Sequence, residues 1–282
     1  MKITTLIENK ANSNDPKLTS EWGLSLYIEF NNHSILFDMG TSGAFADNAK
    51  HLSIKIDSVD VAVLSHHHFD HGGGLKRFFE LNSNAKVYLA NMPDGECYSK
   101  VLGFFTKYIG LDRTIVNDHK ERFNFVGKPT EVIPDVFIFP KIIDTHPTPL
   151  GNKHLYLKTK GRFSPDKFSH EIVMAIKENG KLVIFTGCSH NGILNMIDTV
   201  AKEFEGVPIK AVIGGFHLVT SPPFNFMAGT KEEVENIAKS ILNYPIDITY
   251  AGHCTGKKAF NVLESVMGER IKDMPTGTIF DI

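Results

Sequence analysis

The chain has 282 residues, the length of one large α/β domain or two small ones, and its 42% hydrophobic content is normal for a packed core. A formal net charge of -2 provides no general attraction to nucleic acid or to an anionic membrane. No apolar run approaches the length of a membrane span, and the N-terminus lacks the basic-then-apolar pattern of a signal peptide. We therefore expect no nucleic-acid or membrane partner; the oligomeric state stays open.

The cysteine content indicates the compartment. The three cysteines are Cys97, Cys188 and Cys254, an odd number at wide spacing. Such a pattern argues against a disulfide framework and for a reducing environment. We therefore expect a cytoplasmic protein.

Patterns in the first ninety residues predict strands at 2–8, 24–30, 34–37, 61–64 and 86–90, and helices at 44–52 and 75–81. This order suits the first half of an αββα sandwich, in which two sheets lie face to face with helices outside.

The densest chemical signal follows the strand at 61–64, in the run SHHHFDHGGGL. In extended chain, positions two apart share a side, so His66 and His68 can point at one metal ion. Asp70 and His71 come a turn later and can reach a second ion. We expect His67 to face away from its neighbours and not to be a ligand. Imidazole and carboxylate groups suit zinc and similar divalent ions.

Residues 92–165 are predicted as a variable insert or flap within a single domain spanning 1–282. We expect a helix at 94–107, with Phe104 and Phe105 packed inward rather than forming a lid, a strand at 132–139 and a Pro-bearing loop at 145–151.

The last third repeats the alternation of strands and helices. Thr230 is a plausible N-cap, with Glu233 at capping-box distance. The predicted strands lie near 171–177, 182–186, 211–213 and 246–250, and the helices at 193–204, 231–242 and 257–267; Leu194, Ile197 and Val200 would form the apolar stripe of the first of these helices.

The HxHxDH pattern of residues 66–71 resembles the signature of the metallo-β-lactamase superfamily. The resemblance implies an αββα sandwich of two mixed sheets flanked by helices, and a dinuclear metal site. It also implies that Asp38, which ends a strand in SILFDMGTSG, orients a ligand. Asp70 would additionally assist proton transfer. A simple turn residue is the alternative reading of Asp38.

The later ligands of the superfamily have counterparts here. Cys188 stands in TGCSH where most members have an aspartate that bridges the metals, so Cys188 is either a ligand or a buried apolar residue. We favour His190 over His170 as the mid-chain ligand. His253 follows a late strand and fits the last ligand position; His146 and His154 are weaker candidates, and Cys254 is interpreted as structural.

The resemblance thus assigns His66, His68 and His190 to one metal, and Asp70, His71 and His253 to the other. We expect two divalent ions, zinc first and manganese or iron as alternatives.

Two further features concern the substrate. His217, in IGGFHL, follows a strand and would contact substrate or transfer a proton, or else be structural. Phe224 and Phe226 lie in a Pro-rich loop; we expect them to cover the core, with stacking on a flat ring as the alternative.

The segments TGCSHNGILNMI, IGGFHL, AGHCTG and SEWGLS are similar to a narrower subgroup, the dihydropterin-methyl-(ribofuranosyl)aminobenzene phosphate synthase-like proteins. That subgroup commonly has His where this chain has Trp22. The resemblance implies an enzyme that acts on a phosphorylated or ester small molecule, by hydrolysis or by transfer from a pterin diphosphate. An iron-dependent redox protein and a non-catalytic phosphate- or pterin-binding module are the alternatives.

Overall fold

The computed structural model describes residues 1–101, 105–220 and 225–282, and its chain forms two compact units. The first unit comprises residues 1–92, 109–126 and 274–282, and the second comprises 93–108 and 127–273. The predicted organisation as a single domain with an insert at 92–165 stays a prediction.

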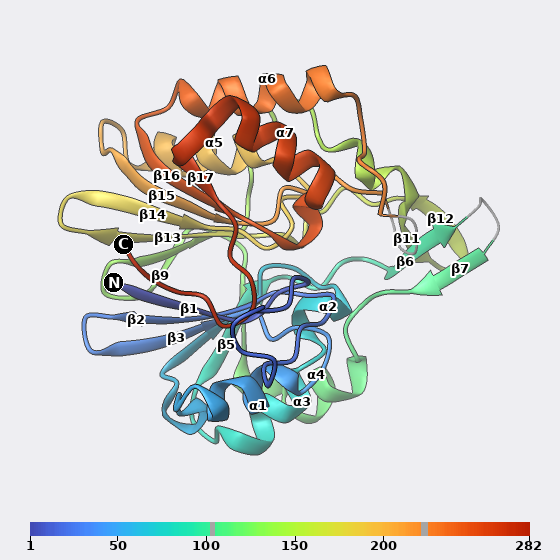
Figure 1. The fold of residues 1–282 in the computed structure, drawn as a ribbon. Coiled ribbons are helices and arrows are strands. Elements are labelled where there is room, and N and C mark those ends of the chain that lie inside the picture. The colour runs from blue at the N-terminus through green and yellow to red at the C-terminus, as the bar shows by residue number, and fades with distance from the viewer. Residues whose placement is uncertain (102–104, 221–224) are drawn as a thin grey trace. The chain divides into compact units, whose positions relative to one another are not determined.

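The first unit is built on a seven-stranded mixed sheet (Figure 1). Neighbours are antiparallel from β18 to β3 and parallel from β3 to β8. In spatial order the strands are β18 (Ile279–Asp281), β1 (Lys2–Ile7), β2 (Ser25–Phe30), β3 (His33–Phe37), β4 (Val61–Val63), β5 (Lys86–Ala90) and β8 (Phe123–Val126).

Helices cover one face of this sheet. Phe45 and Phe78 are fully buried and share a core with Leu36 and Val87 of the sheet. The helices are α1 (Ala44–His51), α2 (Phe69–Gly72), α3 (Leu75–Leu81) and α4 (Arg113–Asp118), with 3₁₀ turns at Ile56–Ser58 and Lys120–Arg122. The predicted helix at 75–81 and strand at 86–90 are confirmed.

The second unit contains another seven-stranded mixed sheet. Neighbours are antiparallel from β9 to β14 and parallel from β14 to β17. In spatial order the strands are β17 (Ile271–Lys272), β16 (Ile246–Ala251), β15 (Ile209–Gly214), β14 (Lys181–Phe185), β13 (Val173–Glu178), β10 (Val136–Phe139) and β9 (Thr130–Ile133).

Three longer helices lie on one side of that sheet (Figure 1): α5 (Ile193–Glu203), α6 (Lys231–Leu242) and α7 (Lys257–Met267). Their buried residues Met196, Val234 and Leu263 join the core over Leu182 and Ile184. The capping box of α6 is present as predicted, whereas Leu194 in α5 is only half-buried. Further 3₁₀ turns span Leu150–His154, His253–Thr255 and Gly268–Arg270.

A separate four-stranded antiparallel sheet in the second unit corrects one prediction. Its order is β12 (Arg162–Pro165), β11 (Leu155–Thr159), β6 (Glu96–Val101) and β7 (Phe105–Tyr108). The helix predicted at 94–107 is therefore wrong, because β6 pairs with β11, more than fifty residues later. Phe105 is 61% exposed, not packed inward, and Phe104 lies outside the described residues.

Two smaller predictions also change. The strand expected at 132–139 is a hairpin of β9 and β10, since Asp135 adopts a left-handed φ of 66° and turns the chain. Phe226 is 57% exposed and so does not cover the core, while Phe224 lies outside the described residues.

The predicted fold class is confirmed as mixed α/β with two sheets flanked by helices. Within the described residues, no helix combines the length and the hydropathy that a membrane span requires.

Candidate functional site

The histidine cluster of the first unit begins where β4 ends. β4 is buried and parallel to both neighbours, so the residues after it emerge at an edge of the sheet. His66 and His71 are fully buried and His68 is 4% exposed. Such burial of three imidazoles is costly unless their nitrogens find partners.

The first two ligand candidates face each other. Nε2 of His66 lies 3.1 Å from Nδ1 of His68, and the ring centroids are 4.5 Å apart. Two nitrogens bound to one tetrahedral zinc ion would stand about 3.3 Å apart. The observed spacing would suit two imidazoles that share one ion; the shared ion itself stays a prediction.

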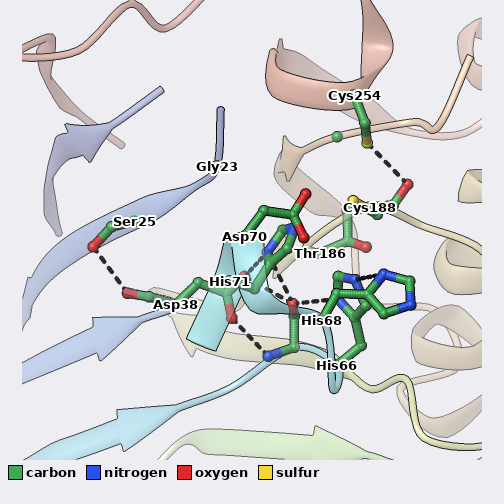
Figure 2. A network of polar contacts seen from close by, with 12 residues as sticks. Gly23, Ser25, Asp38, His66, His68, Asp70, His71, Thr186, Cys188 and Cys254 are labelled. Atoms are coloured by element: carbon green, nitrogen blue, oxygen red, sulfur yellow. Dashed lines mark hydrogen bonds and ion pairs between the residues drawn. The ribbon is translucent and has the colours of Figure 1, made fainter. Parts of the chain in front are cut away.

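Asp38 organises this cluster through a hydrogen-bond network (Figure 2). Its Oδ1 accepts from the backbone N–H of Ser65 at 2.7 Å, and its Oδ2 accepts from the Ser65 hydroxyl at 2.7 Å. The same Oδ2 lies 2.6 Å from Nδ1 of His71. This contact uses Nδ1 and directs Nε2 of His71 toward a metal ion, the arrangement by which carboxylates orient ligating histidines.

His67 takes a different role from its neighbours. It is 1% exposed, and its Nε2 lies 2.9 Å from the carbonyl oxygen of Ala90 in β5. Its ring thus bonds to the sheet, consistent with the expectation that it is not a ligand.

Asp70 lies in the first turn of the short helix α2 and is 8% exposed. Its Oδ2 accepts a hydrogen bond of 3.0 Å from Nε1 of Trp22. No local sequence pattern predicts this contact between Trp22 and Asp70.

In the second unit, four candidate residues follow three adjacent parallel strands. Cys188 and His190 follow β14, His217 follows β15, and His253 follows β16. Carboxyl ends of neighbouring parallel strands meet at one edge of a sheet, so the topology brings these side chains together. The ligand atoms of Cys188, His190 and His217 all lie within 4.8 Å of one another, as do those of Cys188, His253 and Cys254.

The backbone at these positions is unusual. Ser189, His217 and His253 have φ values of 56°, 47° and 50°, in the left-handed region that non-glycine residues rarely adopt. Strained residues of this kind concentrate at functional sites. Each lies just after a strand end, where the chain must turn to present a side chain.

The ring of His190 is fixed from two sides. Its Nδ1 lies 3.0 Å from Oδ1 of Asn152, which leaves Nε2 as the atom to bind a metal ion. Phe168 stacks on the ring with centroids 4.1 Å apart and planes at 4°.

Glu171 holds the turn that carries His190. Its Oε1 accepts from the backbone N–H of His190 at 2.7 Å, and its Oε2 accepts from the N–H of Asn191 at 2.8 Å. Burial raises the pKa of Glu171 to about 7, although these hydrogen bonds act in the opposite direction.

Cys254 connects the loops after β14 and β15. Its thiol donates to the carbonyl of Cys188 at 3.5 Å, and its Sγ accepts from the backbone N–H of His217 at 3.3 Å. A Cβ at Gly215 would come within 2.5 Å of this sulfur, so only glycine leaves room for it. These contacts agree with the structural interpretation of Cys254.

His170, the rival to His190, belongs to a buried polar group. Its Nε2 lies 3.0 Å from Oδ2 of Asp166 and 3.9 Å from Sγ of Cys97. Burial alone would lower the pKa of His170, but the contacts with Asp166 and Cys97 outweigh it and raise the pKa to about 10. A proton on His170 would compete with a metal ion for Nε2, so His190 stays our proposed mid-chain ligand.

The two weakest candidates lie apart from these groups. His146 is half-buried and its Nε2 lies 3.0 Å from Oδ2 of Asp198. His154 is exposed.

The donor sets fit divalent metal ions. The first unit offers imidazoles and a carboxylate, and the second offers imidazoles and a thiolate, all of them zinc ligands. Imidazoles whose second nitrogen already contacts Asp38 or Asn152 have the orientation that metal binding needs.

Sequence reasoning missed the residues that orient these ligands: Trp22, Asn152, Phe168 and Glu171. Only Glu171 carries a local signal, as a carboxylate directly before the apolar run of β13. The others reach the site from distant loops, so their roles depend on the tertiary fold.

Comparison with known proteins shows which family the chain resembles. Residues 23–93 match the model of the metallo-beta-lactamase superfamily. The chain is 31% identical over 300 residues to 7,8-dihydropterin-6-methyl-4-(beta-D-ribofuranosyl)-aminobenzene-5'-phosphate synthase of Methanocaldococcus jannaschii, covering 99% of this chain and 96% of that protein. An uncharacterized protein of the same organism is 27% identical over 274 residues, covering 94% of each chain.

A solved structure extends the similarity. The crystal structure described as a metal-dependent hydrolase of the beta-lactamase superfamily is 27% identical, with a TM-score of 0.82 over 100% of this chain and 99% of that one. The chain therefore belongs to the metallo-beta-lactamase superfamily, and within it to the family of the dihydropterin-methyl-(ribofuranosyl)aminobenzene phosphate synthases.

Proposed function

We propose that this protein is a dinuclear metal-dependent enzyme that acts on a phosphorylated or ester small molecule. The observation that carries the proposal is the buried pair of His66 and His68, whose facing nitrogens lie 3.1 Å apart. One neutral ring can donate an N–H to the other at this distance, and a divalent ion bound by both nitrogens would stabilise the pair more strongly.

We propose ligands in both units. The first unit contributes His66, His68, Asp70 and His71, and the second contributes Cys188, His190 and His253. Zinc is the expected metal, because a thiolate suits zinc better than it suits manganese or magnesium. Manganese and iron are the alternatives that loading experiments must compare.

The metal ions would polarise a phosphoryl or carbonyl oxygen and lower the pKa of a water molecule. Around them the chain's own groups position the reactants and move protons. Asp70 is the proposed proton-transfer residue, because its carboxylate is largely buried in α2 and accepts a hydrogen bond of 3.0 Å from Trp22. Asp38 keeps His71 in one orientation.

A cavity of about 330 Å³ in the second unit supports a small-molecule substrate. It lies among the loop at 146–150, the start of α5 and one face of α6. Its lining is largely apolar, with Ile193, Phe216, Leu218 and Ile237 among the residues. Such an apolar lining suits a planar organic ring. Two of the lining residues, Phe216 and Leu218, are the chain neighbours of His217.

The synthase named above supports transfer of a pterin, and the hydrolase structure supports hydrolysis. We propose the pterin-diphosphate transfer as the first reaction to test. Incubation with a pterin methyl diphosphate and an aminobenzene ribofuranosyl phosphate would release diphosphate in a transferase. A hydrolase would instead cleave a generic phosphodiester.

The deciding experiment measures metal content and turnover together. Wild-type protein loaded with zinc should bind two equivalents per chain and turn over one of these substrates. His68→Ala should lose metal and activity while keeping its circular dichroism spectrum. His33→Ala removes an exposed imidazole from the same unit and should change neither. Wild-type protein without bound metal under several loading conditions would overturn the proposal.

A further inference from the structure

His217 stands apart from the other histidines near the strand ends. Both of its ring nitrogens are buried, and neither hydrogen-bonds to any residue that the structure describes. Leaving a buried polar atom without a partner destabilises the fold. The chain nevertheless maintains this ring at a left-handed φ of 47°, which adds to the cost.

The surroundings show that the ring position is specified. The His190 ring lies 4.1 Å from the His217 ring, centroid to centroid, with the planes at 56°. Gly151 also packs against this ring, where a Cβ would come within 2.9 Å of the His217 ring and 2.4 Å of the Val219 carbonyl. A glycine is thus needed for the loop to pass this close to the imidazole.

The candidate ligand atoms near His217 lie close together. Those of Cys188, His190 and His217 lie within 4.8 Å of one another, at the ends of two adjacent parallel strands, β14 and β15. Cys254 fixes the two loops to each other through the Cys188 carbonyl and the His217 N–H. His190 presents Nε2, because Nδ1 contacts Asn152.

We propose that His217 is a metal ligand and that Cys188, His190 and His217 together hold one divalent ion, with zinc preferred. One thiolate and two imidazoles would occupy three positions of a tetrahedral zinc ion. This role replaces the substrate contact or proton transfer that the sequence suggested for His217. The inference rests on the proposed function only in that the site binds metal.

Cobalt substitution tests the assignment without relying on activity. Cobalt-loaded wild-type protein should show a thiolate-to-cobalt charge-transfer band, which Cys188→Ser abolishes and Cys97→Ser preserves. His217→Asn should weaken the affinity for one equivalent at least tenfold, measured by chelator competition, and should shift the visible bands. Asn is chosen because it tolerates a left-handed φ.

A rescue variant separates ligation from packing. His217→Cys supplies another ligand and should restore the bound equivalent with a stronger charge-transfer band; a purely structural histidine would not allow this. His146→Ala removes the imidazole bound to Asp198 in the same unit and should leave metal binding intact.

Three outcomes would overturn the inference. The first is His217→Asn with wild-type cobalt affinity and spectrum. The second is zinc-loaded wild-type protein whose X-ray absorption shows no sulfur near about 2.3 Å. The third is that His217→Asn misfolds, while His217→Cys folds but binds one metal equivalent fewer than the wild-type protein. If His68→Ala still loses metal in any of these cases, the proposed function survives and only the role of His217 or Cys188 fails.

Discussion

Nε1 of Trp22 donates a hydrogen bond of 3.0 Å to Oδ2 of Asp70, the carboxylate proposed to bind metal and move protons. An indole N–H is a donor only, so this bond can orient the carboxylate but cannot compete for a metal ion. An imidazole, which the subgroup commonly has here, can also donate an N–H. Trp22 is therefore expected to keep the donor role with a larger, apolar ring.

Trp22→Phe should weaken metal binding, because it removes the N–H that donates to Asp70. The variant keeps an aromatic ring, so the packing should change little. We expect a tenfold to 100-fold loss of affinity, about the effect of removing a group that orients a ligand. Chelator competition would measure it. Trp22→His restores a donor and should recover most of the affinity; equal affinities for the Phe variant and wild type would contradict the orienting role.

The same residue gives a direct optical readout. Trp22 is the only tryptophan in the chain, so intrinsic fluorescence excited at the indole reports this one position. Metal binding at Asp70 should change the emission of wild-type protein and leave that of His68→Ala nearly unchanged. An emission that does not respond to bound metal would place the ion away from Asp70.

Asp38→Asn should release His71 from its fixed orientation. Asn tolerates the left-handed φ of 59° at this position and can still accept from Ser65, so the fold should be kept. The loss of the charged contact at 2.6 Å should reduce metal affinity by about tenfold to 100-fold. Asp60→Asn, an exposed carboxylate that accepts from Ser34, is the control. Unchanged metal affinity in Asp38→Asn would mean that Asp38 stabilises the turn but does not orient His71 for metal binding.

Local signals in the sequence predicted much of this molecule. The helix at 257–267 and the capping box of α6 depend on residues within one or two turns, and both are confirmed. The predicted helix at 94–107 failed because its apolar residues pair across a sheet with β11, a partner that no local pattern reveals.

In the candidate site too, local sequence signals predicted some contacts and missed those that depend on the tertiary fold. His66, His68 and His71 come together because their spacing along one loop already places them side by side. The groups that orient ligands come from elsewhere: Asn152 approaches His190 from thirty-eight residues away, and Trp22 approaches Asp70 from forty-eight. Such partners could be identified only once the strand order was known.

Asp166→Asn should destabilise the fold in a manner that depends on pH. The pKa of His170 is raised to about 10 from its ordinary 6.5, so His170 is protonated in the folded state at neutral pH. The stability from this pair is fully present below pH 6.5 and is lost as pH rises toward 10. Removing Asp166 should therefore cost roughly 3–5 kcal/mol at pH 6 and clearly less at pH 10.

Urea unfolding of both proteins at pH 6, 8 and 10 would measure this difference. Asp247→Asn breaks an exposed ion pair with Lys181 and should cost less than about 1 kcal/mol at each pH. A deficit in Asp166→Asn that stays constant from pH 6 to pH 10 would show that His170 is not protonated in the fold.

Cys188→Asp tests how the thiol sets the metal preference. An aspartate is the usual superfamily residue here, and its oxygen ligand suits manganese better than a thiolate does. If Cys188 is a ligand, the variant should keep its metal equivalents, lose the cobalt charge-transfer band and bind manganese more tightly relative to zinc. Elemental analysis after loading with equimolar zinc and manganese would measure the change, with Cys97→Ser as the control.

A rise from one metal equivalent in the wild-type protein to two in Cys188→Asp would mean that Cys188 weakens the second site. Identical content, spectrum and selectivity in variant and wild type would mean that Cys188, 3% exposed, is only a buried apolar residue.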